Sequence, residues 1–161
     1  METVLELEVP ARPEYVAIVR LVVSSLATAR RALVDERIDD LKLAVSEACT
    51  NAIEAHREAK VTAPVTVKVV EGTERLEVHV NDRGLGFDPD HLAIHPPVTD
   101  PDRLNFERGL GIPLIRTLVD EVAFVPGDQG TSVRLILFGG PLGDTNDMTS
   151  EILRVVLSDD D

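Results

Sequence analysis

Residues 41–56, LKLAVSEACTNAIEAH, decide the fold and the chemistry that this sequence predicts. Glu47 and Asn51 are four residues apart, so on a helix they project from one face, one turn above the other. Apolar residues recur at helical spacing beside this pair and form a core-facing stripe. The stripe consists of Ile38, Leu41, Ala44, Val45, Ala48, Cys49, Ala52 and Ile53. Two interpretations of Glu47 and Asn51 are open. Their carboxylate and carboxamide line a binding site next to the core stripe, or they lie on a solvated face of the helix.

Three short glycine-containing breaks follow this helix along the chain. They are Asn81-Asp82-Arg83-Gly84-Leu85-Gly86, then Arg108-Gly109-Leu110-Gly111, then Gly130-Thr131. Gly84 and Gly86 come just after a predicted strand, where the lack of a side chain lets backbone approach a ligand. Gly109 and Gly111 precede a predicted helix, whose free N–H groups favour a phosphate. Taken alone, each break is also compatible with an ordinary turn.

Asp82 is the candidate for base recognition. Its carboxylate only accepts hydrogen bonds, so it suits an exocyclic amine and prefers adenine to guanine, which has a carbonyl at that position. The alternative is an Asx turn, in which the side chain bonds to its own backbone.

Composition limits the functions that this chain can have. Its 161 residues suffice for one well-buried domain, and 29 acidic against 16 basic residues leave a net charge of −13. This charge argues against direct binding to nucleic acid and suits a soluble protein or a basic partner surface. The sequence has neither an apolar run of about 20 residues nor a basic signal-peptide flank, so no membrane association is expected. The single cysteine, Cys49, favours a cytoplasmic location and is either a buried apolar residue or a reactive thiol.

The periodicity predicts the order of elements. Strands are expected at 4–9, 65–70, 76–80, 122–125 and 132–138, and helices at 13–34, 36–60 and 112–120. Residues 87–107 have no regular pattern and read as a lid. The result is an α+β fold, a two-layer α/β sandwich with helices on one face of a mixed, mostly antiparallel sheet. Residues 1–140 form the domain, and residues 141–161 form an acidic C-terminal tail that contains a short amphipathic run and ends in three Asp.

In this order the motifs resemble those of the Bergerat-fold ATPases, the superfamily of gyrase, Hsp90, histidine kinases and MutL. The pair Glu47 and Asn51 looks like the N box. The break from Asp82 to Gly86 looks like the first glycine box, that from Gly109 to Gly111 like the second, and Gly130-Thr131 like the last motif of the superfamily. Within that superfamily the wording SEACTNAIEAH and the run Glu107-Arg108-Gly109-Leu110-Gly111-Ile112-Pro113 look most like the anti-sigma factor serine/threonine kinases. The resemblance covers residues 4–138.

The resemblance implies the role of each site residue. Asn51 would hold Mg²⁺ through its amide oxygen, and Glu47 would be the general base. Asp82 would bind the adenine of ATP with support from Thr131, and Arg108 would reach the terminal phosphate. The nucleotide would be lined by Gly84, Gly86, Gly109, Leu110 and Gly111.

The resemblance departs from the family pattern just after the N box. Some relatives carry a histidine four residues after the asparagine, where this chain has Ala55, and His56 is one position later. We therefore give His56 no role beyond that of a helix-end residue.

The function implied is that of an anti-sigma factor and protein kinase. It would sequester a sigma factor and phosphorylate a Ser or Thr of an anti-anti-sigma antagonist of the STAS type, in a partner switch. The first strand and helix would provide a homodimer face. One alternative is a nucleotide-gated binding module with little or no kinase activity. Another, the catalytic half of a histidine kinase, is disfavoured because no histidine precedes the N box.

Overall fold

The computed structural model describes residues 1–84, 111–139 and 152–159. In chain order the elements are β1 (Glu2–Val9), a 3-10 turn η1 (Pro13–Tyr15), α1 (Val16–Ala29), α2 (Asp35–Ala59), β2 (Val65–Glu71), β3 (Arg75–Asn81), α4 (Gly111–Leu118), β4 (Glu121–Gly127), β5 (Gly130–Phe138) and β6 (Leu153–Val156). The predicted lid at 87–107 lies outside the described residues.

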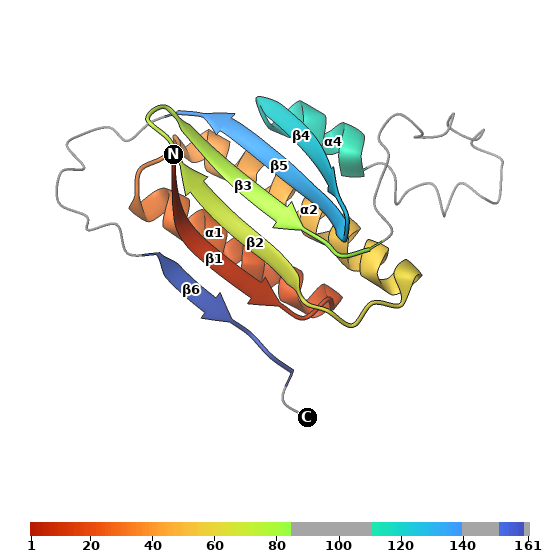
Figure 1. Cartoon of the computed structure of the whole chain (residues 1–161). Helices are drawn as coiled ribbons and strands as arrows, with labels where there is room; N and C mark the ends of the chain where they lie inside the picture. The colour runs from red at the N-terminus through yellow and green to blue at the C-terminus, as the bar shows by residue number, and fades with distance from the viewer. Residues whose placement is uncertain (85–110, 140–151, 160–161) are drawn as a thin grey trace.

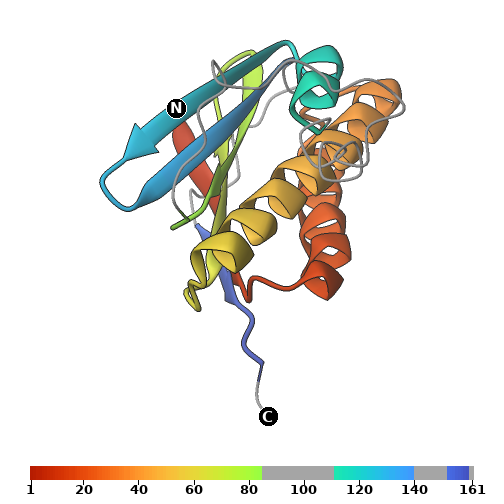
Figure 2. The same cartoon turned by 90° about the vertical axis from the view of Figure 1, so that its right-hand side faces the viewer.

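The strands form one sheet in the order β4-β5-β3-β2-β1-β6. Every pairing is antiparallel except that of β1 with β6, which is parallel. The helices lie together on one face of the sheet, as the two perpendicular views show (Figures 1 and 2). The predicted two-layer sandwich with a mixed, mostly antiparallel sheet is therefore confirmed.

The core lies between the sheet and the helices, and the two sequence periods produce it. Alternate strand residues point toward the helices, so Leu5, Leu7, Val67, Val69 and Val78 are completely buried. The apolar stripe of α2 faces them, and Leu41, Ala44 and Val45 are equally buried. With few aromatic residues, the core is built from small aliphatic side chains that bring α2 close to the sheet.

The two long helices end without glycine. Arg31 and Lys60 both adopt the left-handed conformation, with φ of 52° and 56°. At the first of these ends the N–H of Ala32 bonds to the carbonyl of Ala27 at 3.0 Å, the long backward bond of a Schellman cap. The prediction of a helix as far as residue 34 was therefore wrong, because α1 ends at Ala29. Glycine is the usual sign of such an end, and neither of these positions carries one.

A charged network holds α4 against α2. Arg37 near the start of α2 donates to the carbonyl of Leu118 at 3.0 Å and to the carboxylate of Asp120 at 2.9 Å. The same Asp120 oxygen accepts the backbone N–H of Phe138 at 2.7 Å. One guanidinium therefore ties the end of α4 to α2 and, through Asp120, to the end of β5.

The C-terminal segment adds a strand to the sheet. Residues Leu153–Val156 pair with Leu5–Glu8 of β1, and beyond them the N–H of Leu157 bonds to the carbonyl of Glu8 at 2.8 Å. Asp159 then contacts Arg12 at 2.9 Å and accepts a hydrogen bond from the hydroxyl of Tyr15. The amphipathic run of the tail is therefore a contact segment that covers the outer edge of β1. None of the described helices is long and apolar enough to cross a membrane.

Candidate nucleotide site

The candidate site starts from one face of α2. Glu47 and Asn51 are half-buried on it, and Ala55 follows one turn further along the same face. The buried stripe of α2, which includes Ala48 and Ala52, lies directly beside this face. The predicted register of Glu47 and Asn51 on one helix is confirmed.

The loop after β3 touches this face. A Cβ added to Gly84 would lie 2.8 Å from both the Cβ and the carbonyl oxygen of Ala55, so only glycine allows the loop to approach α2 so closely. Ala55 is four residues beyond Asn51. The first glycine box therefore contacts α2 one turn beyond the N box.

Asp82 is held from two directions. Its N–H donates to the carbonyl of Thr131 at 2.9 Å, and its Oδ1 accepts the N–H of Gly84 at 2.9 Å. Asp82 can therefore form an Asx turn and also bind a ligand, because the turn uses only Oδ1 of its carboxylate. Among the described residues, no donor is found on Oδ2, which remains available to a ligand.

The last motif packs against the same loop. Gly130 has a φ of +140°, and a Cβ there would lie 1.9 Å from the carbonyl oxygen of Asp82. Thr131 is buried at the start of β5. Gly130 and Thr131 thus pack against the backbone of the Asp82 loop. Position 130 requires glycine for two reasons: its positive φ, and the lack of room for a Cβ beside the carbonyl oxygen of Asp82.

Asn51 provides a test of whether the described residues fit a magnesium ion. Its side-chain Nδ2 is buried and has no hydrogen-bond partner in the part of the chain that the structure describes. A buried polar atom left unpaired costs roughly 1–3 kcal/mol, which indicates a missing ligand. Because a half-turn of a carboxamide exchanges oxygen and nitrogen without moving other atoms, the unpaired end can equally be the oxygen. Mg²⁺ takes one or two protein oxygens and completes its shell with water and phosphate, so this donor fits it.

The described residues contain no larger cluster of metal ligands. Within residues 1–84, 111–139 and 152–159 no group of three or more His, Cys, Asp or Glu side chains is arranged to hold a metal ion. Asn51 is thus the candidate that the described residues offer for holding a magnesium ion.

Other predicted site residues lie outside the described part of the chain. They are Gly86, Arg108, Gly109 and Leu110. Gly111, which ends the second glycine box, is the first residue of α4, and so that motif leads directly into a helix, as predicted.

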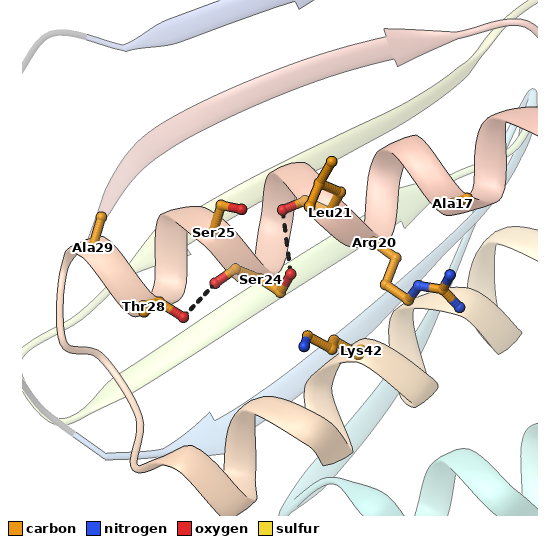
Figure 3. Close-up of a pocket in the computed structure, with 8 residues that line it drawn as sticks. All are labelled: Ala17, Arg20, Leu21, Ser24, Ser25, Thr28, Ala29 and Lys42. Atoms are coloured by element: carbon orange, nitrogen blue, oxygen red, sulfur yellow. Dashed lines mark hydrogen bonds between the residues drawn. The ribbon is translucent and has the colours of Figure 1, made fainter.

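Two hollows lie apart from this face of α2. One hollow, of about 450 Å³, lies on the face of the sheet away from the helices and borders the Asp82 loop. Its lining includes Lys68 and Gln129 but no residue of α2. The other, of about 640 Å³, is the groove between α1 and α2 into which Arg20 and Lys42 extend (Figure 3). None of the predicted site residues lines the second groove.

Burial settles the role of Cys49 and changes that of His56. Cys49 is buried, and this burial raises the pKa of its thiol to about 12, so it is a core residue and not a reactive thiol.

His56 is also buried, which a residue at a helix end need not be. The sequence analysis missed the role of His56 because one of its two hydrogen bonds is to Arg83, 27 positions away along the chain.

Comparison with known proteins agrees with this geometry. The family model of the histidine kinase-like ATPase domain matches residues 9–137. The chain therefore belongs to the family of histidine kinase-like ATPases.

Its relatives narrow the class. The serine-protein kinase RsbW of Bacillus subtilis strain 168 is 43% identical over 136 residues, covering 81% of this chain and 82% of that protein. RsbW of Bacillus licheniformis is 41% identical over 138 residues, covering 83% and 84%. These similarities place the chain among the serine-protein kinases of the family.

A solved structure supports the fold. The crystal structure of the RsbU and RsbW domains of Rv1364c from Mycobacterium tuberculosis matches with a TM-score of 0.57 and 19% identity. The match covers 96% of this chain and 34% of that longer one.

Proposed function

We propose that this protein is an ATP- and Mg²⁺-dependent serine/threonine kinase that also acts as an anti-sigma factor. It sequesters a sigma factor in the cytoplasm and phosphorylates a STAS-type anti-anti-sigma antagonist. The observation that carries the proposal is the contact of the Asp82 loop with Ala55, on the helix face that also carries Glu47 and Asn51, in a chain whose relatives are named serine-protein kinases.

The nucleotide binds through the loop that follows β3. Asp82 accepts the adenine amine through Oδ2, because Oδ1 is already engaged by Gly84, and Thr131 supports that contact. The glycines of the two boxes line the nucleotide, and Arg108 contacts its terminal phosphate. Asn51 holds the magnesium ion, whose charge neutralises the phosphates when it is bound.

Glu47 acts on the hydroxyl of the protein substrate. It is half-buried, and no cation among the described residues pairs with its carboxylate, so it remains available as a base. As the hydroxyl oxygen forms its bond to the γ-phosphorus, the bond from that phosphorus to the bridging oxygen of ADP breaks. The hydroxyl proton passes to Glu47. A positioned base of this kind contributes about 10²–10⁴ in rate.

The proposed homodimer has one constraint. The edge of β1 is paired with β6 over Leu5–Glu8, so a dimer that pairs strands at that edge requires β6 to leave. The outer face of α1 carries Ile18 and Leu21, which are 39% and 65% exposed. This face is the remaining part of the first strand and helix that a second copy can contact.

Two measurements on the unaltered protein test the proposal. Calorimetry with ATP should show binding that depends on Mg²⁺. Incubation with γ-labelled ATP and purified STAS-domain antagonists should then transfer label to a Ser or Thr of one of them. ATP binding without any transfer would favour the nucleotide-gated binding module, and no ATP binding would contradict both readings.

A further inference from the structure

His56 lies at the junction between α2 and the Asp82 loop. Its side chain is 1% exposed. Nδ1 lies 2.9 Å from the carbonyl oxygen of Ala63, and Nε2 lies 2.7 Å from the backbone nitrogen of Arg83. The imidazole therefore bridges the turn that follows α2 and the loop that follows β3.

The two partners define the state of the ring. A carbonyl oxygen can only accept a hydrogen bond, so Nδ1 must carry a proton. A backbone N–H can only donate, so Nε2 must be unprotonated. His56 is therefore neutral and in the Nδ1–H tautomer, and each ring nitrogen is paired with a group that can form no other kind of bond.

This contact completes the pairing of three successive N–H groups in the loop. The N–H of Asp82 bonds to Thr131, that of Gly84 bonds to the side chain of Asp82, and that of Arg83 bonds to His56. Of these three partners, only His56 belongs to α2, the helix that carries Asn51. The imidazole of His56 thus connects two segments by a hydrogen bond. One is α2, which carries Asn51, and the other is the loop after β3, which carries Asp82.

We propose that His56 is a positioning residue that fixes the distance between Asn51 and Asp82 for nucleotide binding. This inference rests on the proposed function, since it concerns the same nucleotide. His56 does not touch the nucleotide. It holds the loop at its place against α2, where Gly84 meets Ala55.

Two substitutions separate the two bonds. In His56→Gln the longer side chain brings a carbonyl oxygen to the position of Nε2, so the N–H of Arg83 keeps an acceptor. In His56→Asn the shorter amide reaches only the position of Nδ1, so it keeps a donor for Ala63 and leaves the N–H of Arg83 unpaired. Each variant loses one ring contact, and both should unfold at a somewhat lower temperature than the unaltered chain.

ATP affinity should distinguish them. The N–H of Arg83 is part-buried, so leaving it unpaired favours a shift of the loop, and we expect His56→Asn to bind ATP about tenfold more weakly than the unaltered protein. His56→Gln should bind within about threefold. Equal weakening in both variants, in proportion to their loss of thermal stability, would show a purely structural role and overturn the inference.

A measurement that does not use ATP completes the test. In the unaltered protein, ¹⁵N NMR should show His56 as the Nδ1–H tautomer, and the amide of Arg83 should exchange slowly with solvent. A protonated Nε2 or fast exchange at Arg83 would overturn the inference even if ATP binds normally. If the unaltered protein shows the expected tautomer and slow exchange but binds no ATP, the proposed function fails, and with it the role of this contact in nucleotide binding.

Discussion

Gly84 lies against Ala55, so close that a Cβ on the glycine would come within 2.8 Å of the helix backbone. Asn51 in α2 and Asp82 after β3 are 31 residues apart along the chain, and this contact joins the loop of Asp82 to the helix of Asn51, one turn beyond the amide. The geometry of the site therefore depends on a position where a single methyl group has no room.

Gly84→Ala should weaken ATP binding by at least about tenfold, because the loop must move away from α2 to fit the methyl group. Calorimetry measures the affinity. Gly127→Ala is the matched control, since a Cβ there meets only the carbonyl oxygen of Gly130 at 3.6 Å, an ordinary contact. Normal affinity in the Gly84 variant would mean that the loop does not need this contact to bind nucleotide.

Asn51→Ala should abolish the Mg²⁺-dependent part of ATP binding without destabilising the fold. The buried Nδ2 has no partner among the described residues, so its removal breaks no hydrogen bond to them and takes away an unpaired polar atom. Thermal unfolding should show a midpoint equal to or above that of the unaltered chain. Thr50→Ala, which removes an exposed hydroxyl bonded only to its own helix, is the control for ATP binding. A large loss of stability in Asn51→Ala would indicate a structural amide instead of a ligand.

Glu47→Gln should leave ATP affinity nearly unchanged and slow phosphate transfer by about 10²–10⁴. The amide has the shape of the carboxylate but cannot accept the hydroxyl proton. Single-turnover transfer of label to the antagonist measures the chemical step. Glu36→Gln, an exposed acid in the first turn of the same helix, should transfer at the normal rate. Equal rates in the two variants would remove Glu47 from the role of base.

Burial of Cys49 should make stability fall at high pH. The thiol has an ordinary pKa of 9.0, and burial raises it to about 12 in the folded chain. Above pH 9 the unfolded chain releases this proton and the folded chain keeps it, so a rising pH favours unfolding. Between pH 9 and pH 11 the free energy of unfolding should fall by about 1.4 kcal/mol per pH unit more steeply than in Cys49→Ala. Parallel denaturant curves for the two proteins over this range would contradict the assignment.

A chain that stops at Glu151 should associate more strongly than the full chain. Its β1 edge would expose unpaired N–H and C=O groups over Leu5–Glu8, which are paired with β6 in the structure. Light scattering over a range of concentrations measures the mass. Arg12→Ala is the control, because it removes the ion pair with Asp159 but keeps β6. If truncation leaves the mass unchanged, the tail does not restrict the use of this edge.

Much of the fold was predictable because its elements repeat locally. The alternation in β2 and β3 and the apolar stripe of α2 identified strands and helix, since each pattern describes neighbours within one or two turns. The motifs at Asp82 and Gly130 were recognisable for a different reason, namely their resemblance to the ordered motifs of a known superfamily. The end of α1 was not, because a left-handed cap at Arg31 carries no glycine to mark it.

By itself, the sequence determined the alternation of strands and helices, the burial of small aliphatic residues, and the order of the four motifs along the chain. The tertiary structure alone decided that Gly84 touches Ala55, that His56 pairs with Arg83, and that the C-terminal residues Leu153–Val156 cover the edge of β1. The physical reason is distance along the chain. A local period records which side of an element is buried, whereas a contact between remote residues leaves no repeating trace and exists only once the sheet and helices have packed.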